Sequence, residues 1–164
     1  AGVLINTAGF LQSKSQETGQ QSSKQVNDSL QEAVTVGNVT NNGTIDKVNV
    51  TLTQAPGASE IDLVNATTNW IGSSGTYTLV HDTAGDGSEW TFKTYAVKDT
   101  DGDSTVLNDA DDRHNIDFIL EGTGASELTE GNEATIKINT MAGATTEIRF
   151  TVPKSLGQKN AVEL

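Results

Sequence analysis

"VTVGNVTNNGTIDKVNVTLTQ", residues Val34–Gln54, is rich in β-branched side chains and largely alternates apolar with polar positions. This alternation is typical of half-buried β-strands, so we predict strands over residues 34–40 and 44–54. Between them lie Asn42 and Gly43, two residue types that turns favour. This part of the chain therefore indicates a β protein.

The same pattern recurs through the rest of the chain, with turn residues between the apolar runs. Further strands are predicted over residues 76–82, 90–99, 115–120, 134–140 and 146–153, and Glu60–Gly72 is a candidate for one more. The turns fall at Pro56-Gly57, Ser74-Gly75, Asp86-Gly87 and Gly143. Seven or eight short strands with regular turns predict a mainly β fold, an antiparallel immunoglobulin-like β-sandwich over residues 34–164.

Residues 1–33 follow a different pattern, without proline and with apolar residues at helical spacings of seven and four. These apolar residues are Val3, Leu4, Phe10, Leu11, Val26 and Leu30, and Val34 just beyond the segment continues the spacing of four. We predict one long N-terminal α-helix over residues 1–33, about 45 Å long. Its polar middle, residues 12–25, has no apolar stripe with which to pack on the chain's own β domain. Something else must therefore cover its first eleven residues.

Charge limits the classes of partner. The 164 residues include 10 Lys plus Arg against 22 Asp plus Glu, a net charge of −12. Such a surface repels phosphates, which argues against nucleic acid and anionic membranes as partners. Uniform acidity is also typical of proteins that work in very high salt, where screening weakens self-repulsion; an ordinary acidic secreted protein is the alternative. Without cysteine the chain has no thiol chemistry and no disulfides.

No catalytic constellation emerges from the sequence. It contains no G-x-S-x-G elbow, no P-loop and no complete G-x-G-x-x-G motif. His81 and His114 lie on or beside different predicted strands, without the local spacing of metal ligands, and we expect both at the surface. We therefore predict a protein that is not an enzyme and has no small-molecule substrate.

One acidic stretch, "DTDGDSTVLNDADD" (Asp99–Asp112), stands out from the general acidity. Asp99, Asp101 and Asp103 alternate as carboxylates do at positions 1, 3 and 5 of a calcium loop. Ser104 then replaces the usual glycine, and Ala110 stands where the bidentate glutamate would be. We predict either a Ca²⁺ or Mg²⁺ site at these three aspartates or a solvated acidic loop. No cofactor is required.

Five Asn-x-Ser/Thr triplets are candidates for N-glycosylation, which would imply an exported protein. The asparagines are Asn27, Asn38, Asn42, Asn49 and Asn65. Incidental triplets in a threonine-rich β protein are the alternative.

The N-terminus "AGVLINTAGFLQSKSQETGQQSSKQV" (Ala1–Val26), and above all its "VLINTAGFLQ", resembles the archaellins, the archaeal flagellins of the swimming filament. The C-terminal segments "LTEGNEATIKINT" (Leu128–Thr140) and "TEIRFTVPKSLGQKNAVEL" (Thr146–Leu164) resemble the end of that family. In this family a prepilin-type peptidase removes a charged leader, and apolar helices bundle in the filament centre inside a wall of β domains. The resemblance implies that this sequence starts within that helix.

The resemblance thus implies a structural subunit of the archaellum, extracellular, self-assembling, and served by separate export and motor machinery. Val3, Leu4, Phe10 and Leu11 would bury against equivalent helices of neighbouring copies, and the acidity suggests a halophilic archaeon. Two alternatives stay open. One is a subunit of a non-rotating adhesive pilus, and the other is a Ca²⁺-dependent cell-surface binding sandwich.

Overall fold

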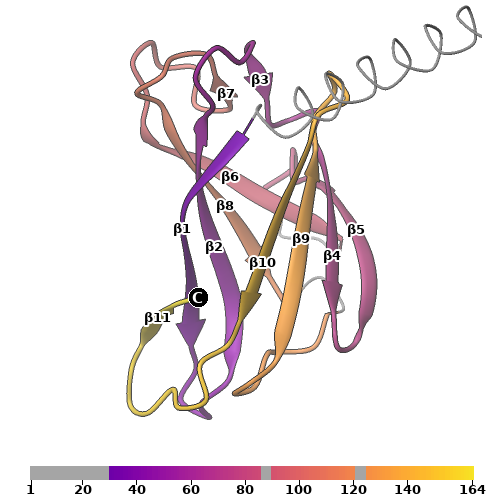
Figure 1. Cartoon of the computed structure of the whole chain (residues 1–164), viewed down its shortest axis with the longest axis vertical. Coiled ribbons are helices and arrows are strands. Elements are labelled where there is room, and N and C mark those ends of the chain that lie inside the picture. Colours follow the sequence, from indigo (N-terminus) through magenta and orange to yellow (C-terminus); the bar gives the residue numbers. More distant parts are fainter. Residues whose placement is uncertain (1–29, 86–89, 121–124) are drawn as a thin grey trace, which may run out of the picture.

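The computed structural model describes residues 30–85, 90–120 and 125–164, and all regular elements in these ranges are β-strands (Figure 1). They are β1 Leu30–Val39, β2 Ile45–Gln54, β3 Ile61–Asp62, β4 Thr67–Gly72, β5 Gly75–His81, β6 Thr91–Lys98, β7 Val106–Leu107, β8 Arg113–Ile119, β9 Glu133–Asn139, β10 Thr145–Thr151 and β11 Ala161–Glu163. The predicted mainly β class is confirmed. A search of the described residues finds no helix with the length and apolarity needed to cross a membrane.

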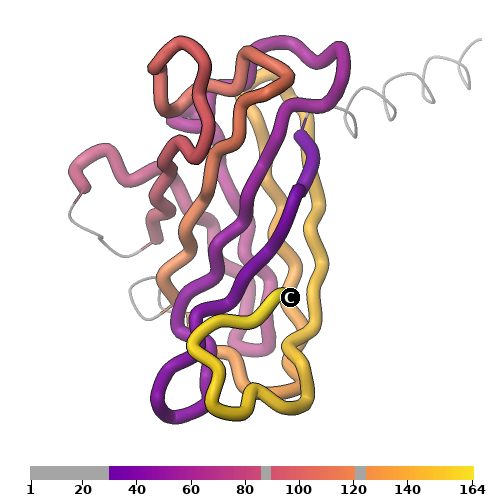
Figure 2. Tube along the Cα trace, turned by 90° about the vertical axis from the view of Figure 1, so that its left-hand side faces the viewer, coloured from indigo at the N-terminus to yellow at the C-terminus, as the bar shows by residue number. Residues whose placement is uncertain are grey.

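Nine strands form one sheet in the order β10-β9-β4-β5-β6-β8-β2-β1-β11, and β3 pairs with β7 separately. The sheet folds over on itself, so that β1 and β2 lie in one layer and β9 and β10 in the other (Figure 2). All neighbours are antiparallel except β5 and β6, which pair in parallel at Val80–Thr91 and His81–Phe92. The prediction of wholly antiparallel pairing is wrong at this point. Here the chain passes from one layer to the other, and only two residues of each strand overlap.

The core lies between the two layers. Trp70 of β4 packs against Phe118 of β8 with ring centroids 5.9 Å apart, and against Phe150 of β10 at 6.0 Å. Along β2, Val48, Val50 and Leu52 are fully buried at alternate positions, as the strand period requires. These contacts join the layers into one domain with a core of its own.

β1 corrects the predicted end of the N-terminal helix. Residues 30–33, for which the apolar spacing predicts a helix, belong to β1, where Leu30 pairs with Gln54 of β2 and is 2% exposed. The spacing of four between Leu30 and Val34 fits both the helical period and the strand period, so the apolar pattern alone cannot separate the two. The rest of the predicted helix, residues 1–29, lies outside the described residues.

The candidate strand over Glu60–Gly72 is two short strands, β3 and β4. The Asp62 carboxylate accepts a hydrogen bond from the backbone N–H of Val64 (2.9 Å), and the N–H of Ala66 donates to the carbonyl of Leu63 (3.3 Å). These bonds make a turn, and the turn ends the strand. The short strands β7 and β11 were not predicted, because neither shows an alternating run.

Candidate cation site in the acidic loop

The acidic loop that follows β6 is folded around the carboxylate of Asp99. Its Oδ1 accepts hydrogen bonds from the backbone N–H groups of Asp101 (3.2 Å) and Gly102 (2.9 Å), and its Oδ2 accepts one from Ser104 (2.7 Å). Gly102 has φ +87° and Ser104 has φ +40°, so the chain turns sharply around the carboxylate. Asp99 therefore organises the loop backbone as well as offering oxygens to a ligand.

Asp112 organises the second half of the stretch. It is 0% exposed, and its carboxylate accepts hydrogen bonds from the backbone of Thr100, Asn108 and Asp109 and from the hydroxyl of Thr100, at 2.9–3.3 Å. Burial acts to raise the pKa of Asp112, but the N–H groups of Asp109, Asn108 and Thr100 outweigh it and hold that pKa below its ordinary value. Asp112 thus ties the start of the acidic stretch to its end.

Asn108 links the two remaining aspartates of the alternating series. Its Nδ2 donates to Oδ2 of Asp101 (2.9 Å) and to Oδ2 of Asp103 (3.0 Å). The other oxygen of Asp103, Oδ1, is buried and has no hydrogen-bond partner among the described residues. One carboxylate oxygen is therefore left facing inward without a donor.

His114 of β8 lies close to Asp103 and Asp99. One ligand atom each of Asp99, Asp103 and His114 lie within 4.8 Å of one another. His114 is 0% exposed, and both of its ring nitrogens lack a hydrogen-bond partner in the part of the chain that the structure describes. The expectation that His114 lies at the surface is wrong. It is buried because it shares the inward face of β8 with Ile116 and Phe118, an alternation visible in "RHNIDFIL".

The structure thus brings together two of the three predicted aspartates, with a histidine in place of Asp101. Burial, reinforced by the charges of Asp101 and Asp99, raises the pKa of Asp103. Two carboxylates and an imidazole, with unpartnered buried lone pairs, form a donor set that fits a divalent cation.

His81 is half-buried at the end of β5, where its Nε2 lies 2.8 Å from the Thr94 hydroxyl and its ring packs edge-on against Phe92 at 5.7 Å. It takes no part in the cluster of Asp99, Asp103 and His114.

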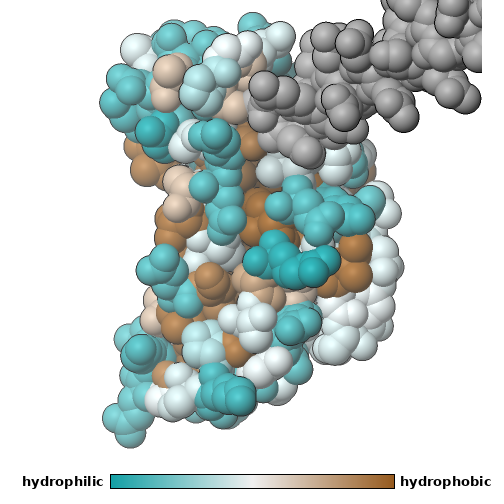
Figure 3. Space-filling view, viewed as in Figure 1, coloured by the Kyte–Doolittle hydropathy of each residue, from teal (hydrophilic) through white to brown (hydrophobic). Residues whose placement is uncertain are grey.

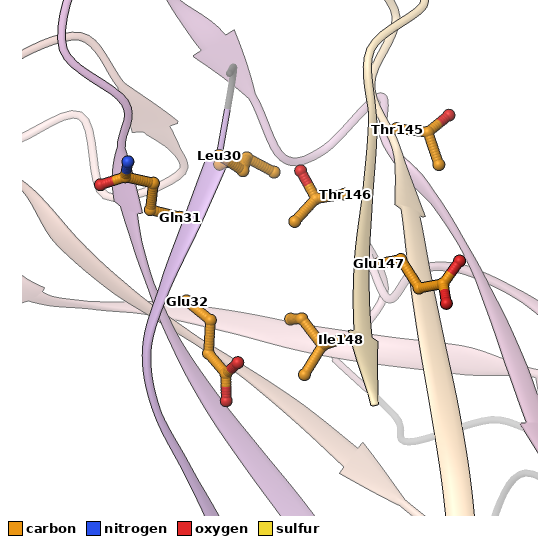
Figure 4. A pocket seen from close by; sticks show the side chains of 7 residues that line it. All are labelled: Leu30, Gln31, Glu32, Thr145, Thr146, Glu147 and Ile148. Carbon is orange, nitrogen blue, oxygen red and sulfur yellow. The ribbon is translucent and has the colours of Figure 1, made fainter. Parts of the chain in front are cut away.

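A groove of about 420 Å³ runs between β1 and β10. Figure 4 shows Leu30, Glu32, Thr146 and Ile148 pointing into it, whereas Gln31 and Glu147 point away. Hydrophobic surface is visible between polar regions on this face in Figure 3. The carboxylate of Glu32 accepts a hydrogen bond from the Thr35 hydroxyl. The residues lining this groove include no histidine.

The predicted glycosylation asparagines Asn38, Asn42, Asn49 and Asn65 lie in or beside β1, β2 and the β3–β4 turn. Asn27 and the predicted assembly residues Val3, Leu4, Phe10 and Leu11 lie outside the described residues.

Comparison with known proteins places the chain in a family. Flagellin A2 of Halobacterium salinarum is 41% identical over 168 residues, which span 100% of this chain and 84% of that protein. The family model for archaeal-type flagellin matches residues 1–150.

The chain belongs to the archaeal-type flagellin family. The resemblance seen in the N- and C-terminal segments is confirmed, and the halophilic relative fits the acidic composition. As a member of this family the chain is a structural subunit of the archaellum, the filament on the outside of the archaeal cell.

Solved structures support the fold of this flagellin. The crystal structure of archaeal flagellin FlaB1 from Methanocaldococcus jannaschii superposes with a TM-score of 0.74 at 20% identity, covering 82% of this chain and 95% of that one. The archaeal flagellum of Methanospirillum hungatei gives a TM-score of 0.59 at 18% identity, covering 99% of this chain and 87% of that one.

Proposed function

We propose that this flagellin polymerises through its N-terminal segment, with Val3, Leu4, Phe10 and Leu11 buried against equivalent segments of neighbouring copies. In this proposal the domain from Leu30 onward is an immunoglobulin-like sandwich that forms the outer wall. The subunit has no catalytic activity, and separate membrane machinery exports the chain and drives rotation.

The observation that carries this proposal is the closed core of the β domain. Among its largest buried side chains, Trp70 packs against Phe118 of the opposite layer, and Phe118 packs against Phe92 of the neighbouring strand β6. A domain that is stabilised by its own core leaves a further apolar segment available to other copies. A contact between copies that does not close on itself generates a helical polymer.

Replacing both Leu4 and Phe10 with serine tests the proposal. The variants are expressed from the full-length gene in a flagellin-deleted strain, and filaments and swimming are scored by electron microscopy and motility assay. We expect no filaments and no swimming, with the subunit still present in the membrane. Gln20→Ser and Gln21→Ser in the polar stretch serve as the matched control and should assemble. Normal filaments in the Leu4/Phe10 variant would refute assembly through this segment.

The same strains separate the alternatives. Cells that form filaments with the wild-type gene but swim no better than the deletion strain would support a non-rotating adhesive pilus. Absence of filaments, together with Ca²⁺-dependent attachment of cells, would support a surface-binding sandwich.

We also propose that Asp99, Asp103 and His114 hold a divalent cation that stabilises the loop. The specific observation is the buried, unpartnered donor set, since Oδ1 of Asp103 and both nitrogens of His114 lack partners among the described residues. Carboxylates alone favour Ca²⁺ or Mg²⁺. An imidazole ligand shifts the preference toward Mn²⁺ or Zn²⁺. Calorimetric titration of the chelator-treated protein with Mn²⁺, Zn²⁺ and Ca²⁺ tests whether the first two bind more tightly than Ca²⁺. A lack of heat with all three ions would refute the proposed site.

A further inference from the structure

Four Asn-x-Ser/Thr triplets lie within the described residues, and the contacts of each carboxamide nitrogen distinguish them. In an N-glycosylated asparagine, Nδ2 is bonded to a sugar carbon and keeps one of its two hydrogens. A folded subunit therefore tolerates the modification only where at least one hydrogen is free and the surroundings have room for a sugar.

Asn49 meets neither condition. It is half-buried on β2, the strand between β1 and β8. Its Nδ2 donates to the hydroxyl of Tyr95 at 2.7 Å and also to the carboxylate of Asp117, so both hydrogens are used. A sugar on Nδ2 of Asn49 would remove one of these hydrogen bonds and would push apart the side chains that now make contact there.

Asn38 and Asn65 are exposed, but each nitrogen is engaged once. Asn38 lies within β1, opposite Lys47 and Ala161 of the two neighbouring strands, and donates to Asp46 at 2.7 Å. Asn65 donates to Asp62 at 2.6 Å across the β3–β4 turn. After modification, each asparagine could keep its hydrogen bond through the hydrogen that remains on Nδ2. The sugar would then have to pass beside the aspartate that accepts this bond.

At Asn42 the carboxamide nitrogen has no hydrogen-bond partner among the described residues, and no side chain bonded to it stands in the way of a sugar. It is exposed at the turn between β1 and β2, and its side chain makes no hydrogen bond within the described part of the chain. The following Gly43 has φ +75°, and no atom outside its two chain neighbours lies within 4 Å of the position that a Cβ would occupy there. In Figures 1 and 2 this turn lies at the end of the domain opposite the start of β1. The structure therefore offers open solvent around Asn42.

We propose that Asn42 carries an N-linked glycan in the assembled filament and that Asn49 carries none. The bond joins Nδ2 of Asn42 to the anomeric carbon of a sugar that is supplied as a glycosyl phosphate ester. The anomeric carbon–oxygen bond to phosphate breaks, the phosphate leaves with the electron pair, and Nδ2 gives up one proton. The glycan projects from the end of the domain remote from the start of β1.

Mass spectrometry of filaments purified from the cells that make them tests the proposal. Trypsin cuts after Lys24, Lys47 and Lys93 and so separates Asn42, on fragment 25–47, from Asn49, on fragment 48–93. We expect fragment 25–47 to carry sugar mass, and fragmentation to place it on Asn42. Asn42→Gln and Thr44→Ala should remove that mass, whereas Thr44→Ser should keep it.

Asn41→Gln is the matched control, because Asn41 is an exposed neighbour in the same turn and is not followed by the required pattern. Its filaments should keep the full glycan mass. An unmodified Asn42 in wild-type filaments would overturn the proposal. A sugar on Asn49 would overturn it as well, as would unchanged glycan mass in the Asn42→Gln filaments.

Discussion

Asp99 and Asp103, four residues apart in one loop, are held in opposite electrostatic environments. The backbone N–H groups of Gly102 and Ser104 lower the pKa of Asp99, whereas burial and the charges of Asp101 and Asp99 raise the pKa of Asp103. Backbone N–H groups thus stabilise the charged form of Asp99, whereas at Asp103 burial and the neighbouring charges outweigh the N–H of Val106. A cation beside Asp103 would supply the missing compensation.

The first prediction concerns this compensation. Adding Mn²⁺ or Zn²⁺ to the chelator-treated protein at moderate salt should raise its melting temperature by roughly 5–15 °C at a hundredfold excess over Kd, because binding to the folded state alone stabilises it. Ca²⁺ should raise it less, since imidazole is a poor ligand for calcium. Differential scanning calorimetry measures the shift.

The variant His114→Gln should lose the Mn²⁺ and Zn²⁺ shifts while the domain still melts cooperatively. Asp111→Asn is the matched control, because the Asp111 side chain is 74% exposed and pairs only with Lys98 at 3.3 Å among the described residues. It should keep the full shift. Equal metal shifts in His114→Gln and the wild type would exclude His114 as a ligand.

A second prediction concerns Asp112 and pH. Asp112→Asn should cost about 2–4 kcal/mol near neutral pH, because the amide leaves buried N–H donors facing an NH₂ group. The pKa of Asp112 is lowered from its ordinary 3.8 in the folded state, so the carboxylate stabilises the fold above about pH 4. That stabilisation is lost as pH falls through the lowered folded-state value. Denaturant unfolding of both proteins at pH 6 and pH 3 should show the difference shrinking at the lower pH.

Much of the fold could be predicted, because each layer of the sheet needs an apolar inward face. On β2, Val48 and Val50 occupy alternate buried positions, as do Ile136 and Ile138 on β9, and this alternation is visible in the sequence. The parallel pairing of β5 with β6 could not be predicted from the sequence, because it depends on where the chain passes from one layer of the sheet to the other. β11 was missed because Val162 is its one apolar residue in contact with the core.

The candidate site was predictable only in part. The alternating aspartates pointed to the loop, but the use of Asp99 and Asp103 without Asp101 depends on a backbone turn that local spacing does not specify. The spacing of ligands along the chain does not reveal His114, because its neighbours in the sequence are not its neighbours in the site. Its position on the inward face of "RHNIDFIL" was the available signal. Ligands from different elements meet only in three dimensions.

A third prediction tests the reassignment of Leu30 to β1. Leu30→Ala should destabilise the β domain by about 2–5 kcal/mol, since a buried leucine loses its contacts and leaves a cavity. Gln31→Ala, at the exposed neighbouring position, should change the unfolding free energy by less than about 0.5 kcal/mol. Urea unfolding compares them. Equal, small effects would place Leu30 outside the core.

A fourth prediction separates the two parts of the chain. Deleting residues 1–25 should leave a β domain that melts cooperatively, because the core from Leu30 onward packs between its own layers. Circular dichroism should keep its β signature, and the melting temperature should stay within a few degrees of the full chain. Loss of a cooperative transition would mean that the deleted residues contribute to the domain core.

The last prediction concerns Asn49, whose side chain is a structural member of a polar cluster. The carboxylate of Asp117, only 5% exposed, accepts hydrogen bonds from Asn49 and from the Tyr95 hydroxyl (3.1 Å) and pairs with Lys47. Burial acts to lower the pKa of Lys47, but the hydrogen bond and charge of Asp117 outweigh it and leave that pKa raised. The buried carboxylate of Asp117 is therefore held by two hydrogen-bond donors and one ion pair.

Asn49→Ala should cost about 1–3 kcal/mol, because a buried carboxylate loses one donor. Asn49→Asp should cost more at low salt, because it sets a second carboxylate beside Asp117, and the excess should shrink as salt screens the repulsion. Asn42→Ala and Asn42→Asp at the exposed turn are the matched controls and should stay within about 0.5 kcal/mol of the wild type. Denaturant unfolding in low and high KCl measures all four. If the two Asn49 variants were as stable as their Asn42 counterparts, the cluster would not require Asn49, and a sugar at that position would meet no structural barrier.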